Sequence, residues 1–543
     1  MNQLEAPMYM RVNDEKEANE YLRTGIWTDQ SLHDRISYFA KTTPAQPAIS
    51  DGTRSWTYLE LNDYVLRLAR TLLDLGVDRG EVVALQSMNT LHLPAMHAAL
   101  AWIGAILAPV SPQWRDAEML PLLSTSRAGL LIHTTDDSYD RTAAAASYVN
   151  RVASLREAIS LETLDALVKE ARPLDPKEVR HRTSKANDPQ LAMCSSGSTG
   201  IPKIALHSFN NLYTQGVSTA GHAYGLSSND ITLAIAPANI GSTGYVYPIL
   251  AALSVGAQAN LLQHWSPEAA LTKLRDLNVT VAVAVPTQML MMLDHPVEKF
   301  NLRSLRVVLT GGAPLPPNVA GDFERRFGCR MHKVYGASDG GIAACTDLDT
   351  PETQRFSTVG RIARGHDVKI LTNGQVAPPG TSGEVVWHGP SKSFGYLNQG
   401  EMDVQAWHGG YFHSGDIGVI DDDGYLSIVG RIKEMILRGG HNIFPAEIEL
   451  LLNEHPAIES VVVVGVPDDR LGERACAVIS AAAGHAVPSV EEIQNFLTER
   501  NLAKYKFPEF VVSLDQIPVN AGGKVDRPSI NEIAREALAE RDF

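Results

Sequence analysis

Amphipathic helical segments alternate with short apolar runs along much of this chain, and that alternation limits its fold more than any other feature. Thr57 and Glu60 form a capping box at the start of one such helix, and Gly76 follows its end. Its apolar face carries Leu61, Val65, Leu68, Leu72 and Leu75. The strand-like run EVVALQ comes next, and the same order recurs before a predicted buried strand at 279–285. This pattern predicts α/β layers with largely parallel sheets.

The chain is also too long for a single domain. Its 543 residues exceed the roughly 250–300 residues that one hydrophobic core serves. From about Val376 short strands and tight turns dominate, and near Lys433 a compact α+β pattern begins. We therefore predict a large domain over residues 1–430 and a small domain over 431–543.

Charge and cysteine content narrow the possible partners. The formal net charge is −15 with no basic run, so nucleic acid and anionic membrane surfaces are poor partners. The cysteines form no CxxC pair, which argues against a zinc site or a disulfide framework and favours a reducing compartment: Cys194, Cys329, Cys345 and Cys476.

One apolar stretch, 91–110, approaches the length of a membrane span. It contains histidines, a proline and Gly104, so it predicts a buried helix followed by a strand. The first twenty residues are acidic and lack an apolar core, so we expect no secretory signal and a cytoplasmic protein.

The strongest local signal is CSSGSTGIPK at 194–203. Alternating glycine and serine allow backbone amides to converge on an anion, the hydroxyls add donors, and Lys203 adds a point charge. Such a loop suits the β- and γ-phosphates of a nucleotide. It is not a Walker A loop, because Pro202 rather than glycine precedes the lysine.

This loop resembles the phosphate-binding motif of the adenylate-forming superfamily, which includes acyl- and aryl-CoA synthetases, carrier-loading adenylation domains and firefly luciferase. Further motifs of that superfamily occur in family order: TGGAPL at 310–315, YGASD at 335–339, HSGD at 413–416, GRIK at 430–433 with PAEIE at 445–449, and PVNAGGKV at 518–525. The stretch 21–36 is similar to the aryl-acid AMP ligase and cyclohexanecarboxylate-CoA ligase branch. The resemblance implies a large domain of layered α/β sheets with a distorted barrel, and a small mobile α+β domain.

The resemblance also implies an acid–thiol ligase that uses ATP, Mg²⁺ and coenzyme A. A carboxylate attacks the α-phosphorus of ATP, so cations must offset the repulsion between two anions. The implied catalytic residues are Lys524, Lys203 and Asp339, with Asp339 also the metal ligand. The implied ATP-binding residues are Ser195, Ser196, Gly197, Ser198, Thr199, Gly200, Lys203, Gly312, Ala313, Pro314, Val334, Tyr335, Gly336, Ser338, Asp416, Arg431 and Lys524.

For the second half-reaction, the resemblance implies that the small domain rotates about Lys433. A pantetheine arm would then pass Gly439, Gly440 and His441, since paired glycines permit close backbone approach. The implied acid-binding residues are Asn239, Ile240, Gly241, Thr243, Gly244, Gly336, Gly340 and Gly341. Small residues predict room for an aryl, alicyclic or other bulky acid.

The chain departs from the family pattern at several positions. Asp339 replaces the usual Glu, so it must reach magnesium through a water or a small backbone shift. Ile204 replaces a common Gly, Phe209 stands where His is usual, and Asn239 falls where many acyl-CoA synthetases have an aromatic or His gate.

Three functions are thus compatible with the sequence. The leading hypothesis is an aryl- or alicyclic-acid CoA ligase. A stand-alone enzyme that loads a separate carrier protein is the alternative, because no carrier motif is fused here. A non-catalytic acyl-binding relic is disfavoured by the presence of Lys203, Asp416, Arg431 and Lys524. The acid, the pathway and the choice between monomer and homodimer stay open.

Overall fold

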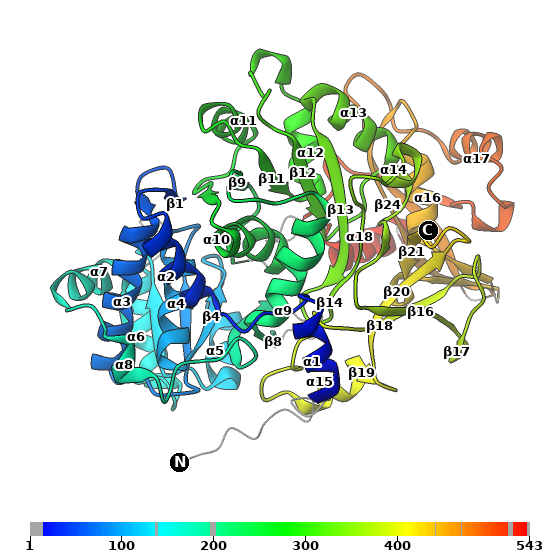
Figure 1. Ribbon diagram of the computed structural model, residues 1–543. Helices are drawn as coiled ribbons and strands as arrows, with labels where there is room; N and C mark the ends of the chain where they lie inside the picture. Colours follow the sequence, from blue (N-terminus) through cyan, green and yellow to red (C-terminus); the bar gives the residue numbers. More distant parts are fainter. Residues whose placement is uncertain are drawn as a thin grey trace.

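The computed structural model describes residues 15–135, 140–195, 202–239, 241–439, 441–468, 470–519 and 525–539. Four sheets organise these residues, and Figure 1 shows them in sequence order from the blue N-terminal part to the orange and red C-terminal part. The predicted α/β fold with a large N-terminal part and a smaller C-terminal part is confirmed.

The first sheet has the order β6-β5-β3-β4-β7-β8. All its neighbours are parallel except the last pair, in which β8 returns beside β7. Its strands are β3 (Val82–Gln86), β4 (Ile106–Val110), β5 (Leu130–His133), β6 (Glu157–Ser160), β7 (Pro189–Ser195) and β8 (Lys203–Ser208). Its helices are α3 (Tyr58–Asp74), α4 (His92–Ile103), α5 (Asp116–Ser126), α6 (Arg141–Arg151), α7 (Leu161–Glu170) and α8 (Pro176–Val179).

The second sheet has nine strands in the order β15-β14-β13-β12-β11-β9-β10-β1-β2. Its interior is parallel and both ends are antiparallel. The strands are β1 (Pro47–Ser50), β2 (Ser55–Thr57), β9 (Ile231–Ala234), β10 (Gln258–Leu261), β11 (Val281–Ala284), β12 (Val307–Gly311), β13 (Arg330–Ala337), β14 (Gly341–Cys345) and β15 (Arg361–Ile362).

Helices around this sheet include two π-helices that the sequence pattern did not predict, η2 (Thr214–Gly221) and η3 (Ser242–Leu250). They pack closely because Gly216 lacks a Cβ, which would lie 3.0 Å from the Val246 carbonyl oxygen. The others are α1 (Glu15–Arg23), α2 (Leu32–Thr42), α9 (Phe209–Tyr213), α10 (Ala251–Val255), α11 (Pro267–Asp276), α12 (Pro286–Leu293), η4 (Val297–Lys299), α13 (Pro317–Phe327) and α14 (Glu352–Ser357).

The third sheet is antiparallel, in the order β17-β16-β18-β20-β19, with β21 beside β20. Its elements are β16 (Asp367–Thr372), β17 (Gln375–Val376), β18 (Gly383–His388), α15 (Gly400–Ala406), β19 (Trp407–His408), β20 (Tyr411–Ile420) and β21 (Leu426–Arg431). The predicted run of short strands therefore begins at Asp367, slightly before Val376.

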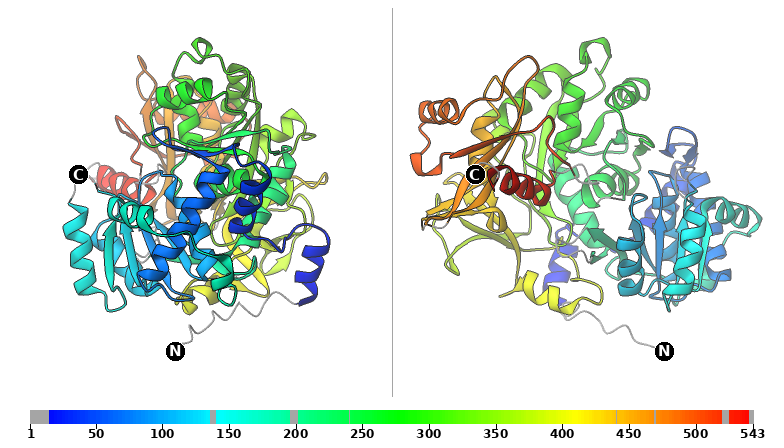
Figure 2. Two further views of the ribbon diagram at one scale, coloured as in Figure 1. Left: turned by 60° about the vertical axis from the view of Figure 1, so that its left-hand side comes forward. Right: turned by 180° about the vertical axis from the view of Figure 1, so that it is seen from behind.

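The C-terminal sheet has its own apolar packing on both faces. Helices α16 (Pro445–Leu452) and α17 (Val490–Glu499) cover one face, and α18 (Arg527–Ala539) covers the other, as the rear view in Figure 2 shows for α18. The remaining elements are η5 (Ile432–Glu434), β22 (Ile436–Arg438), β23 (His441–Ile443), β24 (Ile458–Asp468), β25 (Gly472–Ala481), η6 (Lys504–Lys506) and β26 (Phe510–Ser513).

Several local predictions are confirmed. Thr57 caps α3 through the Glu60 amide, and Ser489 caps α17 through the Glu492 amide. The stretch 91–110 forms α4 and β4, and both are buried. The strand predicted at 279–285 spans only Val281–Ala284. Within the described ranges, no helix is both long and apolar enough to cross a membrane.

Candidate active site

The ends of the predicted phosphate loop are fixed by strand pairing. Ser195 and Lys203 lie opposite each other in the antiparallel β7–β8 ladder, and Cys194 pairs with Ile204. The loop residues Ser196, Gly197, Ser198, Thr199 and Gly200 lie outside the described residues. The chain continues from this loop into β8, a strand that begins at Lys203, and the Lys203 ammonium supplies positive charge at that point.

Lys203 and Asp339, both predicted catalytic residues, meet through a third side chain. The Lys203 ammonium donates to the Tyr396 hydroxyl at 3.3 Å, and that hydroxyl donates to Asp339 Oδ2. Lys203 Nζ also lies 5.1 Å from the centre of the Tyr396 ring. We call Lys203, Tyr396 and Asp339 the Asp339 cluster. Sequence reasoning did not single out Tyr396, and no motif quoted from the sequence includes it.

The Tyr396 phenol is suited to stay protonated in this cluster. Its residue is 1% exposed. Burial, followed by the negative charge of Asp339, raises the pKa of Tyr396 well above its usual value. The phenol therefore donates to Asp339 at neutral pH and leaves its oxygen lone pair for Lys203.

A second cluster forms from the residues predicted to bind the adenosine part. The Tyr335 hydroxyl donates to Asp416 Oδ2 at 2.7 Å, and Arg431 Nε lies 2.8 Å from Asp416 Oδ1. Strand pairing aligns Asp416 with Arg431 across β20 and β21. We call Tyr335, Asp416 and Arg431 the Asp416 cluster. Asp416 is 7% exposed, whereas the Arg431 side chain is 63% exposed, so the guanidinium remains accessible to a ligand.

The predicted adenine-side segments end at the same sheet edge. Gly311 pairs with Val334 in the parallel β12–β13 ladder, so the exposed residues Gly312, Ala313 and Pro314 follow β12 beside the end of β13. Gly336 lies near the end of β13, and Ser338 directly follows that strand. The carboxyl ends of parallel strands are where α/β sheets place ligands. Burial, followed by Asp416, raises the pKa of Tyr335 well above its usual value.

Part of the predicted acid-binding set lies around the same turn. Gly241 has φ 55°, and a Cβ there would lie 2.9 Å from Ser338 Oγ. Ser242 Oγ donates to Gln215 Oε1 at 2.7 Å, which joins η3 to η2. Thr243 and Gly244 follow in η3, and Asn239 donates to the Val110 carbonyl at 3.2 Å. Ile240 lies outside the described residues.

The argument that small residues leave room for the acid is wrong at four positions. A Cβ on Gly244 would clash with the Pro237 carbonyl oxygen, and one on Gly336 would clash with the Gly341 carbonyl oxygen. A Cβ on Gly340 would clash with Phe412 and Trp387, and one on Gly341 would clash with Ser391. The space freed by these glycines is filled by the protein itself. Their placement beside the acid stays a prediction, but their small size does not indicate a roomy pocket.

The predicted residues of the small domain that the structure describes are exposed. Lys433 lies in η5, directly after β21, and Gly439 turns between β22 and β23 with φ 56°. His441 stacks obliquely on Tyr505 with 4.7 Å between ring centres. Gly440 and Lys524 lie outside the described residues. The flanking Val519 and Val525 pair as an antiparallel bridge.

A magnesium ion would find few protein ligands here. Within the described ranges, no three His, Cys, Asp or Glu side chains gather to form a metal site. Asp339 supplies a carboxylate that Tyr396 joins to Lys203. That donor set fits Mg²⁺, which commonly takes one or two carboxylates together with substrate phosphates and waters.

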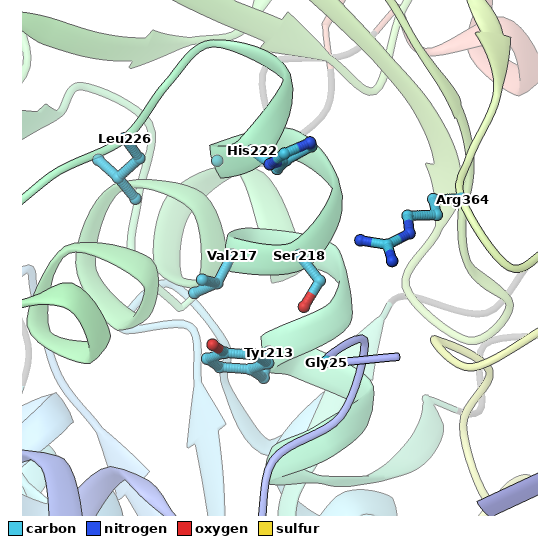
Figure 3. A pocket seen from close by; sticks show the side chains of 8 residues that line it. Gly25, Tyr213, Val217, Ser218, His222, Leu226 and Arg364 are labelled. Carbon is cyan, nitrogen blue, oxygen red and sulfur yellow. The ribbon is translucent and has the colours of Figure 1, made fainter. Parts of the chain in front are cut away.

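A separate pocket lies on the outer side of η2 (Figure 3). It is lined by Gly25, Tyr213, Val217, Ser218, Gly221, His222, Leu226 and Arg364. In η2 the buried residues Thr214, Gln215 and Gly216 face inward, and Gln215 contacts η3. None of the predicted site residues that the structure describes lines this pocket.

The fold and the two clusters together define an enzyme of the adenylate-forming type. Residues 36–397 match the family described as "AMP-binding enzyme", and residues 447–524 match "AMP-binding enzyme C-terminal domain". The chain belongs to the AMP-binding enzyme family, and its predicted class, an AMP-forming ligase of the acyl-CoA synthetase type, is confirmed.

Individual relatives cover nearly the whole chain. It is 29% identical to the medium-chain fatty-acid–CoA ligase of Escherichia coli (strain K12), over 95% of this chain and 92% of that one. It is 32% identical to a feruloyl-CoA synthase of Amycolatopsis sp, over 90% and 95%. The crystal structure of the anthranilate CoA ligase AuaEII in complex with anthranoyl-AMP matches with a TM-score of 0.85 and 21% identity, covering 94% of this chain and 98% of that one.

Proposed function

We propose that this protein uses ATP to convert a bulky carboxylic acid, aryl or alicyclic, to an acyl-adenylate and pyrophosphate. It then transfers the acyl group to coenzyme A, which gives an acyl-CoA and AMP. The observation that carries the proposal is the presence of two charged clusters, one suited to phosphates and one suited to a ribose, at the start of β8, the end of β13 and the paired strands β20 and β21.

Each cluster has a distinct part in adenylation. In the Asp416 cluster, the carboxylate accepts hydrogen bonds from the two ribose hydroxyls and the exposed Arg431 guanidinium donates to them. In the Asp339 cluster, Lys203 takes the outgoing phosphates and Asp339 holds Mg²⁺ with them. The metal ion supplies charge neutralisation at the phosphates. The acid carboxylate attacks the α-phosphorus, and pyrophosphate leaves with the electron pair of the broken P–O bond.

The small domain completes the reaction in this proposal. Lys524 bridges the acid and the α-phosphate during adenylation, within a domain spanning 431–543. The domain then turns about Lys433 and brings Gly439, Gly440 and His441 to the thiol. The exposed position of Lys433 directly after β21 is compatible with a hinge.

Different observations support the proposed acceptor and the proposed acid. Coenzyme A is favoured because the Escherichia coli and Amycolatopsis relatives, which cover 95% and 90% of this chain, are named as a CoA ligase and a CoA synthase. For the acid, those relatives include one named for fatty acids and one named for feruloyl-CoA. The relative named for feruloyl-CoA favours a bulky acid. The glycines do not, because at Gly241, as at Gly340 and Gly341, the space that a Cβ would take lies against protein atoms.

The test is acid-dependent exchange of labelled pyrophosphate into ATP, over a panel of aromatic, alicyclic and fatty acids. We expect the largest exchange with a ring-bearing acid, and a CoA thioester once coenzyme A is added. Absence of exchange with every acid would contradict the proposed adenylation. Exchange without a thioester, followed by loading of a carrier protein, would favour the alternative acceptor.

A further inference from the structure

We propose that Tyr396 and Gln399, from the connection between β18 and α15, are positioning residues that set the Lys203 ammonium and its backbone for the phosphates. This inference rests on the proposed function of Lys203. Neither residue needs to touch the reacting atoms, because both act through Lys203 and Asp339.

The connection reaches Lys203 by adding a short strand-like segment to β8. Three backbone hydrogen bonds make this pairing: Phe394 N–H to Leu206 O at 2.8 Å, Leu206 N–H to Gly395 O at 2.9 Å, and Leu397 N–H to Ile204 O at 2.8 Å. Ala205 and Tyr396 form an antiparallel bridge within it. β8 stands at the end of the first sheet, so this segment covers an otherwise free strand edge.

Gln399 holds the peptide groups on both sides of Lys203. Its Oε1 accepts from the Ile204 N–H at 3.0 Å, and its Nε2 donates to the Pro202 carbonyl at 2.9 Å. A side-chain amide thus pairs with the backbone as a neighbouring strand would, where the chain enters β8 from the loop. The Gln399 N–H in turn donates to the Tyr396 carbonyl at 3.2 Å.

Tyr396 fixes the ammonium group of Lys203, whereas Gln399 holds its backbone. Its hydroxyl accepts from Lys203 Nζ at 3.3 Å and donates to Asp339, so one oxygen separates a cation from an anion. Without that hydroxyl, the two opposite charges are free to approach each other directly. The phenol keeps the ammonium available for phosphate and the carboxylate available for a divalent cation.

The backbone of Tyr396 is itself anchored in the core. Its N–H donates to Asp403 Oδ1 at 2.6 Å, and Asp403 lies buried in α15. The connection therefore has the rigidity that a positioning role requires, since a loosely held hydroxyl could not fix the spacing of two charges.

The hydroxyl is tested with Tyr396→Phe, which keeps the ring. We expect kcat for pyrophosphate exchange to fall about 10- to 100-fold and the Mg²⁺ concentration for half-maximal activity to rise several-fold, with Tm nearly unchanged. Tyr58→Phe is the matched control, because Tyr58 is fully buried and its hydroxyl donates to the Ala257 carbonyl at 2.7 Å, outside both clusters. We expect this control to stay within about twofold of wild type.

The two hydrogen bonds from the Gln399 side chain to the backbone around Lys203, here called the Gln399 clamp, are tested with Gln399→Ala and Gln399→Glu. We expect the alanine variant to raise the KM for ATP about tenfold. The glutamate variant should raise it at least as much, because it keeps the acceptor for Ile204 N–H but sets an anion against the Pro202 carbonyl, beside the proposed phosphate site. Gln494→Ala is the control, since Gln494 donates to the Pro508 carbonyl at 3.0 Å in the C-terminal part. Control and clamp variants with the same KM would contradict the clamp.

Failure of this inference differs from failure of the proposed function. Active wild type with Tyr396 and Gln399 variants that match their controls would overturn the inference alone. If wild type shows no exchange with any acid, the proposed function fails. Calorimetric binding of Mg·ATP then tests the inference without turnover: weaker binding in both variants supports it, and equal binding contradicts it. If Tyr396→Phe does not fold, the Gln399 pair decides.

Discussion

The Asp416 cluster and the Asp339 cluster are built in different ways. In the Asp416 cluster, Asp416 and Arg431 face each other across paired strands, and their charges meet directly. In the Asp339 cluster, Lys203 begins a strand, Asp339 lies in a turn, and a hydroxyl from a distant connection joins them. Backbone register thus sets the Asp416 cluster, whereas side chains of an irregular segment set the Asp339 cluster. The Asp339 cluster should be the more easily disturbed.

The largest effect should come from Lys524→Ala, which removes the charge proposed for the carboxylate and the α-phosphate. Loss of one donor at a developing charge typically costs about 10²- to 10³-fold in kcat. We expect a loss of that size in pyrophosphate exchange, with thioester formation from added acyl-adenylate retained. Equal loss of both half-reactions would contradict the assignment of Lys524 and leave the two clusters to account for adenylation.

Asp416→Asn should produce the next largest effect. The substitution removes the charge that pairs with Arg431 and accepts from Tyr335. We expect the KM for ATP to rise about 10- to 50-fold, with a smaller change in kcat, because the ribose contact is present in both the ground and transition states. The check compares kcat and KM for ATP with those for 2′-deoxy-ATP. We expect the variant to discriminate less against 2′-deoxy-ATP than wild type does. Unchanged discrimination would remove the ribose from the Asp416 cluster.

Tyr335→Phe sharpens the comparison because it is the counterpart of Tyr396→Phe. Each variant deletes a phenol hydroxyl that donates to a buried or half-buried carboxylate. We expect Tyr335→Phe to raise the KM for ATP about two- to fivefold and to leave the Mg²⁺ dependence unchanged. Titrating Mg²⁺ for both variants separates the two ends. The same shift in both variants would show that the clusters are not distinct.

Asp403→Asn should have the smallest effect, on stability. Burial raises the pKa of Asp403 to about 6, so the folded state favours the protonated form. Wild type therefore loses stability as the pH rises from about 4 to about 6, where the unfolded carboxyl is already ionised. The asparagine cannot ionise and still accepts from Tyr396 N–H. We expect its Tm relative to wild type to rise by about 1–2 °C between pH 4.5 and 7.5. A flat difference would contradict the shifted ionisation.

The fold and the Asp416 cluster could be predicted because their signals are local. Thr57 and Glu60 lie three residues apart and cap α3 as their spacing indicates. Asp416 and Arg431 each belong to a motif that keeps its place in the family order, and strand pairing then aligns them. For such residues the sequence indicates both the type of side chain and its place in the fold.

Tyr396, Gln399 and the two π-helices could not be predicted in the same way. Tyr396 contacts a lysine 193 residues earlier in the chain, and no periodicity relates the two positions. The π-helix η2 depends on how closely Gly216 packs against η3. Gly340 shows the opposite error, because its small size indicated space for a ligand while Trp387 and Phe412 occupy that space. Only the tertiary packing distinguishes these cases.

The pairing of Ser195 with Lys203 has a consequence for how this loop can evolve. Successive side chains of a strand point to opposite faces, so a one-residue insertion or deletion between these positions cannot be absorbed by sliding β8 against β7. A slide of one step would turn the lysine to the opposite side of the sheet and break the Gln399 contacts at the same time. The register of β8 on β7 therefore ties the side of the sheet on which Lys203 lies to the number of residues between Ser195 and Lys203.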